Sequence, residues 1–491
     1  MRIITGLIFF LSTSWMVVAE EAHPKHEIRA VWLATIYGLD WPSRPAIDEN
    51  GRTLQQQELC VMLDRLRDAN FNTVFVQARL RGDVIYPSAI EPVARVFTGA
   101  YGSLPGYDPL AFVIDECHRR GMECHAFFVT FPVGTSKIVD EQGSLSVVKQ
   151  RPHLCLRYRN EWYLDPGLPE TADYILALVQ EIVCNYDIDG IQFDYVRYPG
   201  KVFPDENSYS KYGRGASLED WRRANINRLM ERVNGWVKKE KPWVQVSSSP
   251  VGKYRRSAST PRAGWTAYDD VYQDPHAWMA AGNHDMIVPM MYFTHDEFDP
   301  FLDHWIEQAR PRHMVAGLAA YRLNSSEGDW SLSEISSQID RVRGHGADGC
   351  AFFRTRFVVD DEKGIYTRLK DHYFRYPAQL PPLTWMSGDD PPAAPSEIRV
   401  ARDGNRLHLS WDTYPDGRDC TYTVYYSLAD SLDTGRAQSI LATGLRENGL
   451  SVTVSDGDER GYLFAVTASN RYRIESLPSY ETYYYYSKYE K

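Results

Sequence analysis

The sequence has no excess of basic residues and no motif that binds a nucleotide. Its 491 residues include 54 Lys and Arg against 65 Asp and Glu, a formal net charge of −11. Surfaces that bind nucleic acids are basic because they must neutralise phosphates, so this balance argues against a nucleic-acid partner. Phosphate loops, Gly-x-Ser-x-Gly turns and His-Glu-x-x-His zinc motifs are also missing. We therefore expect neither a cofactor nor a metal.

Cysteine is scarce and shows no metal-binding spacing. The seven cysteines include no Cys-x-x-Cys pair, so we expect no structural zinc site. Most of them lie inside apolar segments, where cysteine behaves as a small hydrophobic residue. The sequence therefore predicts few or no disulfides.

Long apolar runs are missing except at the N-terminus. Met1 and Arg2 precede an apolar run, and Val17-Val18-Ala19 ends just before Glu20. A basic start, a short apolar core and small residues before the cut are typical of a secretory signal. We expect residues 1–19 to be a signal peptide, and the protein to be periplasmic or extracellular without a membrane span. An N-terminal anchor helix is the alternative, but the run is short for one.

Residues 27–376 alternate between short apolar segments and helical patterns. The apolar segments are typical of strands buried on both faces, and they cover 29–35, 73–77, 123–128, 190–194, 244–249, 286–290, 314–319 and 349–353. Helical patterns lie between them, including 56–69, 109–120, 218–240 and 361–374. Eight alternations predict an α/β fold, the (β/α)₈ barrel. A doubly wound sheet is the alternative, but residues 34–37 are not the glycine-rich loop that usually follows its first strand.

A different pattern begins at residue 377. Residues 377–395 are rich in proline and predict a stiff linker. From 396 to 480 apolar and polar residues tend to alternate, which predicts a small all-β sandwich. Residues 409–411, 422–425 and 462–468 resemble strands of a fibronectin type III module.

The carboxyl ends of the predicted strands are where a barrel places its functional residues. The fourth strand ends on Asp194, which could act as a nucleophile, a base or a metal ligand, or could cap a helix. Asp296 and Glu297 follow the sixth strand. They are the best-placed candidates for a second catalytic carboxylate, although they could instead cap the next helix.

Other residues near the strand ends are candidates for contacting a substrate. Arg79 could bind a hydroxyl or carboxylate in a bidentate manner, with Asp83 as its partner, or the two could form a purely structural ion pair. Tyr292 could stack on a ligand or donate a hydrogen bond, whereas His125, alone on an apolar strand, is more typical of a satisfied core group. The remaining candidates are Trp32, Asp40, Gln77, Tyr195, Arg197 and Arg354.

Several segments together resemble a known family. Residues 29–35, 77–88, 163–167, 189–195 and 290–292 are similar to the divergent glycosyl-hydrolase-like family ten, exported bacterial proteins with a (β/α)₈ barrel. The resemblance implies a glycan substrate, which for some members is peptidoglycan. It also implies that Asp194 is the leading catalytic carboxylate, with Arg79, Asp83 and Gln192 lining the site. Many relatives end the fourth strand on two consecutive acids, whereas Tyr195 follows Asp194 here, so the second acid stays open.

We therefore expect an exported glycoside hydrolase that acts on a polysaccharide such as peptidoglycan glycan strands. Aromatic residues make up 13% of the chain, and they could fill a large core or form stacking surfaces for sugar rings. Glycoside hydrolysis usually needs two carboxylates, and the sequence identifies one. The second hypothesis is therefore a non-catalytic carbohydrate-binding protein on the same barrel. In a third, a surface scaffold, the C-terminal sandwich carries the function.

Overall fold

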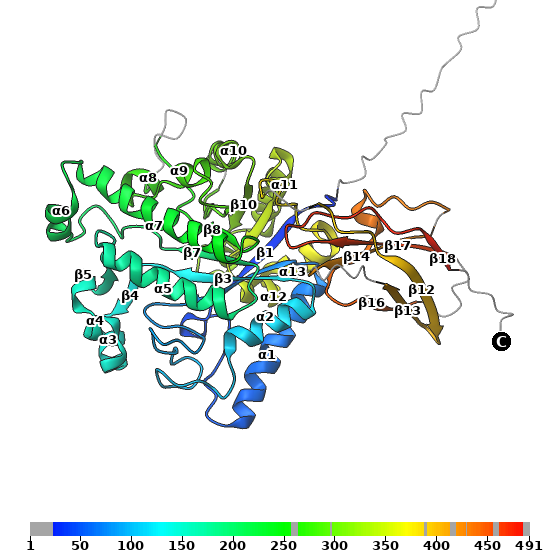
Figure 1. The fold of residues 1–491 in the computed structure, drawn as a ribbon, viewed down its shortest axis with the longest axis horizontal. Helices are drawn as coiled ribbons and strands as arrows, with labels where there is room; N and C mark the ends of the chain where they lie inside the picture. Colours follow the sequence, from blue (N-terminus) through cyan, green and yellow to red (C-terminus); the bar gives the residue numbers. More distant parts are fainter. Residues whose placement is uncertain are drawn as a thin grey trace, which may run out of the picture.

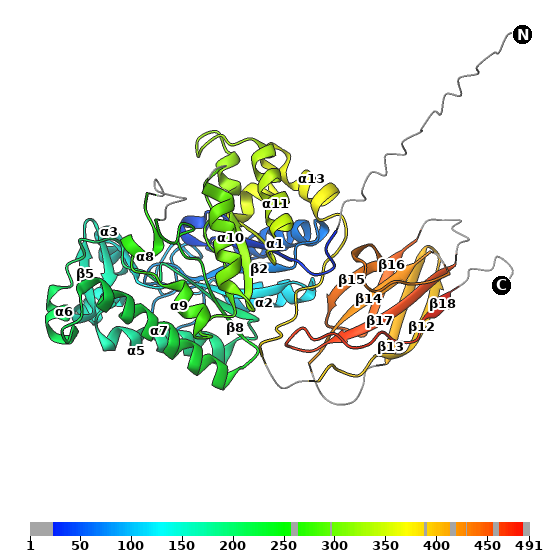
Figure 2. The same ribbon diagram turned by 90° about the horizontal axis from the view of Figure 1, so that it is seen from above.

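A barrel and a small all-β domain lie end to end in the computed structural model (Figure 1, Figure 2). The structure describes residues 23–256, 264–294, 297–386, 390–412, 419–428, 430–454 and 461–484. The predicted signal peptide lies outside these residues. None of the described helices is long and apolar enough to cross a membrane.

Eight parallel strands close into a barrel, which confirms the predicted fold. Their order around the barrel is β1-β2-β3-β7-β8-β9-β10-β11, with β11 pairing back to β1. The strands are β1 (Ile28–Leu33), β2 (Thr73–Arg79), β3 (Glu123–Val129), β7 (Gly190–Asp194), β8 (Gln245–Ser248), β9 (Met286–Ile287), β10 (His313–Leu318) and β11 (Gly349–Phe352). Strand β9 is three residues shorter than predicted. Beyond it, Met290 pairs only through isolated bridges to Val251 and Gly317.

Helices cover the outside of the barrel. The larger ones are α1 (Glu49–Asp68), α2 (Pro109–Arg119), α5 (Pro169–Asn185), α7 (Leu218–Glu240), α10 (Phe298–Ala309) and α11 (Leu332–His345). Helix α1 begins seven residues before the predicted start, because Asp48 caps it by accepting a hydrogen bond from the Gly51 amide. The predicted helix 361–374 is broken into α13 (Ile365–Arg368) and a π-helical turn, Leu369–Tyr373, after the short helix α12 (Thr355–Val359).

Two apolar layers result from the alternation of side chains along each strand. One set packs between strands and helices, for example Ile191 and Phe193 of β7. The other fills the inside of the barrel and includes Trp32, Phe75 and Phe127. Alternation therefore turns Gln192 and Asp194 of β7 toward the barrel interior.

Long excursions follow β3 and other strands at the carboxyl end, and they are the enlarged loops that about 350 residues for eight strands predict. The first is a three-stranded antiparallel sheet of β4 (Pro132–Thr135), β5 (Cys155–Tyr158) and β6 (Glu161–Leu164). It carries the short helices α3 (Ser136–Gln142) and α4 (Val147–Gln150). Further short helices are α6 (Glu206–Tyr212), α8 (Ala267–Asp270) and α9 (Pro275–Ala280). The three-stranded sheet and helices α3, α4 and α6 lie at the end of the barrel away from the all-β domain (Figure 1).

The C-terminal domain consists of two antiparallel sheets packed on a shared apolar core. Within the described residues, one sheet has β12 (Ser396–Asp403), β13 (Arg406–Asp412) and β16 (Gly449–Thr453). The other has β15 (Ile440–Leu445), β14 (Thr421–Ser427), β17 (Tyr462–Ser469) and β18 (Thr482–Tyr484). Trp411, Val424 and Phe464 lie in the core between them. The alternating pattern after residue 395 therefore forms the strands that it predicted.

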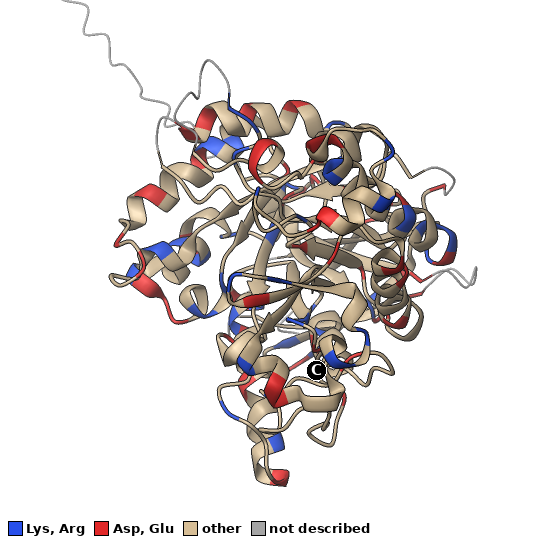
Figure 3. Ribbon diagram, turned by 90° about the vertical axis from the view of Figure 1, so that its left-hand side faces the viewer, with Lys and Arg blue, Asp and Glu red and all other residues tan. Residues whose placement is uncertain are grey.

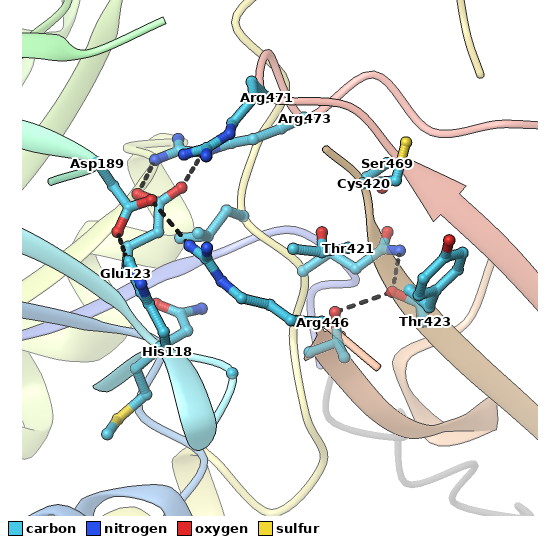
Figure 4. A pocket seen from close by; sticks show the side chains of 18 of the residues that line it. His118, Glu123, Asp189, Cys420, Thr421, Thr423, Arg446, Ser469, Arg471 and Arg473 are labelled. Carbon is cyan, nitrogen blue, oxygen red and sulfur yellow. Dashed lines mark hydrogen bonds and ion pairs between the residues drawn. The ribbon is translucent and has the colours of Figure 1, made fainter. Parts of the chain in front are cut away.

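The all-β domain is clamped to the amino ends of the barrel strands by ion pairs around a cavity of ≈ 300 Å³ (Figure 4). The Arg473 guanidinium binds the carboxylate of Glu123, the first residue of β3, in a bidentate manner. Arg471 donates to Asp187, just before β7, at 2.9 Å. The backbones of Gly121 and Gly444 also meet so closely that a Cβ on Gly121 would lie 2.7 Å from the Thr443 carbonyl oxygen.

The proline-rich segment is packed against both domains rather than free. The Glu27 amide, just before β1 at the amino end of the barrel, donates to the carbonyl of Gln379 at 3.0 Å, and Leu383 is buried. The Leu383 amide donates in turn to the Tyr472 carbonyl of the all-β domain, also at 3.0 Å. The linker and its contacts therefore join the two domains on the side away from the barrel's carboxyl end.

Candidate active site

Asp194 is the last residue of β7 and its carboxylate is held at the mouth of the barrel. Its Oδ1 accepts a hydrogen bond from the Tyr195 amide at 2.7 Å. The Asp194 carbonyl accepts from the Thr130 amide at 2.9 Å and from the Thr130 hydroxyl at 2.8 Å. The residue is only 9% exposed, and this burial raises the pKa of its carboxyl group, although the charge of Arg197 opposes the rise. The result is a fixed, partly desolvated carboxylate.

Arg197 lies beside this carboxylate in a stack of aromatic rings. Its guanidinium is 4.6 Å from the ring centroid of Tyr195 and 4.7 Å from that of Trp265. Such cation–π contacts hold a guanidinium without using its hydrogen-bond donors. Its Nε has no hydrogen-bond partner among the described residues. Arg197 therefore keeps, beside Asp194, a buried donor that no described residue binds.

Glu161 of β6 is a second carboxylate near the mouth, and the sequence pattern did not single it out. It forms an ion pair with Arg81, whose charge also acts on Asp194. Its Oε2 accepts a hydrogen bond from the Tyr163 hydroxyl at 2.8 Å. Glu161 lies in the excursion after β3, so no strand end marked it. The only sequence feature near it is the family-like segment 163–167, which begins at Tyr163.

The two predicted candidates for the second carboxylate have different outcomes. Glu297 precedes α10 but makes no side-chain cap there, and its Oε2 lies 2.5 Å from the Lys253 ammonium. Asp296 lies outside the described residues. Glu161 and Glu297 are thus both ion-paired carboxylates on carboxyl-end segments.

Trp32 and Gln192 form a polar contact inside the barrel. The Trp32 indole donates to Gln192 Oε1 at 2.6 Å, and the ring is almost fully buried, so Trp32 is not a free stacking surface. Gln192 Nε2 and the hydroxyl of Ser247, its register partner on β8, are buried without a hydrogen-bond partner within the described part of the chain. Unsatisfied buried donors are costly. Both atoms are buried polar groups in the barrel interior below the mouth.

Tyr292 belongs to an aromatic wall on the far side of the mouth. Its ring lies 5.7 Å from that of Tyr321 and 6.1 Å from that of Phe353. Burial, together with the nearby charge of Asp194, raises the pKa of Tyr292. The phenol therefore stays protonated near the carboxylate.

Several predicted contact residues are instead occupied in supporting the wall. Arg79 is fully buried and binds Glu91, not Asp83, with donor–acceptor distances of 2.8 and 2.6 Å. Its remaining nitrogen, Nη1, donates to the carbonyls of Val129 and Thr130. Arg79 therefore has no exposed donor to offer a substrate. The sequence pointed to Asp83 because the two residues are close in the chain, whereas the loop brings Glu91 to the guanidinium.

Loop contacts also occupy Asp40, Gln77 and Arg354. Asp40 is buried and accepts from the Ala34 amide and from Arg354, both at 2.7 Å. Gln77 Oε1 accepts from the amides of Thr35 and Ile36, at 3.0 and 2.8 Å. These bonds fix the loop after β1.

His125 lies at the other end of the barrel, and its Nε2 is 3.0 Å from Glu123 Oε2. It belongs to the lower layer of the interior, because it is in register with Gly190 at the start of β7. Within the described residues, no three His, Cys, Asp or Glu side chains gather as metal ligands.

The carboxyl end of the barrel is thus a polar mouth with Asp194 near its centre. Figure 3 looks at the end of the molecule away from the all-β domain, where acidic and basic residues are interspersed.

Known proteins are similar in sequence to this chain over most of its length. The family described as glycosyl hydrolase-like 10 matches residues 27–331. Glycosyl hydrolase YngK of Bacillus subtilis (strain 168) is 31% identical over 98% of this chain and 98% of its own. Glycosyl hydrolase DigH of Escherichia coli (strain K12) is 34% identical over 64% of this chain and 79% of its own.

Among solved structures, the glycoside hydrolase domain of PgaB (BpsB) from Bordetella bronchiseptica is similar. It has a TM-score of 0.49 at 13% identity and covers 70% of this chain and 98% of its own. The family match includes Asp194, Glu161 and Tyr292, and the similarity to YngK extends over nearly the whole chain. The chain belongs to the glycosyl hydrolase-like 10 family.

Proposed function

We propose that the protein is an exported glycoside hydrolase that cleaves a polysaccharide, with Asp194 as its nucleophile or general base. The observation that carries the proposal is the Asp194 carboxylate itself. It ends β7, points into the mouth, is fixed by the Tyr195 amide and lies close to Arg197. A buried carboxylate with a raised pKa at the carboxyl end of a barrel is a frequent catalytic arrangement.

The reaction would need an acid to protonate the departing glycosidic oxygen. Glu161 is the better candidate, because it shares Arg81 with Asp194, whereas Glu297 is bound to Lys253. As nucleophile, Asp194 would attack the anomeric carbon and form a glycosyl ester, which water then hydrolyses. As base, it would take a proton from the attacking water. Carboxylates about 5–5.5 Å apart favour the first route, and about 6.5–9.5 Å the second.

The substrate that we propose first is the glycan strand of peptidoglycan. The predicted signal peptide would place the protein where cell-wall glycan is present, and the family resemblance supports a glycan substrate.

The test is product analysis by mass spectrometry on a panel of glycans, including peptidoglycan with and without its stem peptides. We expect wild-type protein to release new oligosaccharides and Asp194→Asn to release none. The asparagine keeps an oxygen for the Tyr195 amide, so the fold should survive. Asp173→Asn, on exposed α5 surface, is the matched control and should keep full activity. Wild-type rates in Asp194→Asn would refute the assignment.

A second candidate function is non-catalytic carbohydrate binding on the same barrel. The observation that favours it is that Glu161 and Glu297 are both neutralised by a cation. Glycan binding by both wild type and Asp194→Asn, without product from any glycan, would support this function instead.

A further inference from the structure

Two large aromatic side chains in the described part of the barrel are exposed. Tyr37 is 67% exposed and Trp265 is 47% exposed. Tyr37 follows β1, and Trp265 lies in the connection after β8. β1 and β8 occupy the first and fifth places in the barrel order, so they are on opposite sides of an eight-stranded barrel. Both rings therefore belong to the carboxyl end, one on each side of the mouth.

Trp265 is tied to Asp194 through Arg197. The guanidinium lies between the Trp265 and Tyr195 rings, and its charge acts directly on the Asp194 carboxylate. The stack fixes one face of the indole, and the ring remains about half exposed. An exposed, immobilised indole loses little entropy when a ligand packs on it.

Tyr37 borders a cavity of ≈ 500 Å³ on the opposite side. The cavity is also lined by Arg81, Asp83, Tyr101 and Lys137. Arg81 connects this side to the centre, because it lines the cavity, forms an ion pair with Glu161, and its charge acts on Asp194. Tyr37 has a φ of 56°, a left-handed conformation that is rare for a bulky residue and common near functional sites.

We propose that the mouth is a continuous cleft that binds the interior of a glycan chain, with sugar rings stacked on Tyr37 and on Trp265 on either side of Asp194. The ligand class is an oligosaccharide long enough to reach both rings. Polar groups of the cavity beside Tyr37, including the Asp83 carboxyl and the Lys137 ammonium, would meet the sugar substituents. This proposal rests on the proposed function, and it adds that cleavage occurs within glycan chains rather than at their ends.

The binding test uses Asp194→Asn and a ladder of peptide-free peptidoglycan oligosaccharides, from a disaccharide to long strands. We expect affinity to rise with chain length. Adding Tyr37→Ala or Trp265→Ala should each weaken long-chain binding by about tenfold, and their combination should remove the length dependence. Tyr37→Phe keeps the ring and should bind normally. Tyr480→Ala removes a 98% exposed ring outside the barrel and is the matched control.

The product test uses wild-type protein on long strands. Early products of many lengths would support cleavage within chains, and release of only the smallest sugars from the start would overturn it. Unchanged long-chain affinity in both alanine variants would overturn the cleft. Failure of the proposed hydrolysis can be told apart from failure of the cleft, because the binding test does not require turnover. If no products form but the alanine variants lose length-dependent binding, the cleft is supported and the hydrolysis is refuted.

Discussion

Residues of one type have different roles at the barrel mouth because their partners differ. Arg79 and Arg197 each follow or end a strand, and both are nearly buried. The donors of Arg79 are taken by Glu91 and by two carbonyls, so this residue stabilises the wall. Arg197 is held by ring faces and keeps a buried donor that no described residue binds. The nature of the partner, more than the residue type, decides which arginine keeps a free donor.

The raised pKa of Asp194 predicts the pH dependence of catalysis. A nucleophile or base must be ionised, so kcat/KM should rise with pH through a midpoint above about 3.9, the ordinary value for aspartate. Arg197→Gln removes a charge that favours ionisation, and it should move this midpoint to still higher pH. A pH–rate profile of both proteins measures the shift. A midpoint at the ordinary value, unchanged in the variant, would contradict the role of Asp194.

Asp83 predicts a pH dependence of stability. Burial raises its pKa from 3.8 to about 7. The folded state then holds the proton more tightly than the unfolded state, so stability is full below the unfolded pKa and falls as pH rises toward about 7. Asp83→Asn keeps an acceptor for the Arg81 amide and removes this loss. Its Tm should therefore gain on that of the wild type between about pH 4 and about pH 7. Equal dependence of Tm on pH in the wild type and in Asp83→Asn would count against a raised pKa of Asp83.

Strand β7 depends on a glycine at its start. A Cβ on Gly190 would collide with the His125 ring inside the barrel. Gly190→Ala should therefore destabilise the protein by about 1–3 kcal/mol, the usual cost of overpacking, and lower activity by displacing the strand that carries Asp194. Urea unfolding measures the first effect. His125→Ala with Gly190→Ala should recover part of the loss, and purely additive effects would show that the collision is not the cause.

The two domains form one unit with the candidate site at the end remote from their interface. Although burial opposes ionisation of Glu123, Arg473 and His125 hold its pKa well below the usual range. The interface contacts the amino ends of β3 and β7, and Asp194 lies at the carboxyl end of β7. The all-β domain therefore supports the barrel from below rather than covering its mouth.

Weakening this interface should loosen the whole molecule without removing the site. Arg473→Gln leaves Glu123 without its bidentate partner, so we expect a lower Tm and faster protease cleavage in residues 377–395. Activity at low temperature should be retained. Arg399→Gln, which breaks an exposed ion pair with Asp412 inside the all-β domain, is the control. Equal cleavage rates in the two variants would argue against a clamp.

Features that depend on neighbours in the chain were predictable from the amino-acid sequence alone. Buried strands and capped helices arise from local patterns, so all eight barrel strands and the position of Asp194 at a strand end could be predicted. The predicted extents of β9 and α1 were wrong, because strand pairing and helix capping decide where an element begins and ends.

Which residues far apart in the chain meet depends on the folded arrangement and could not be predicted. Barrel closure places Tyr37 and Trp265 on opposite sides of one mouth, and the excursion after β3 brings Glu161 to Arg81. The same folding brings Glu91 to Arg79 and Arg473 to Glu123, partners that no local pattern links. Such contacts depend on how segments far apart in the chain pack against each other, and a periodicity within one segment carries no information about its neighbours in space.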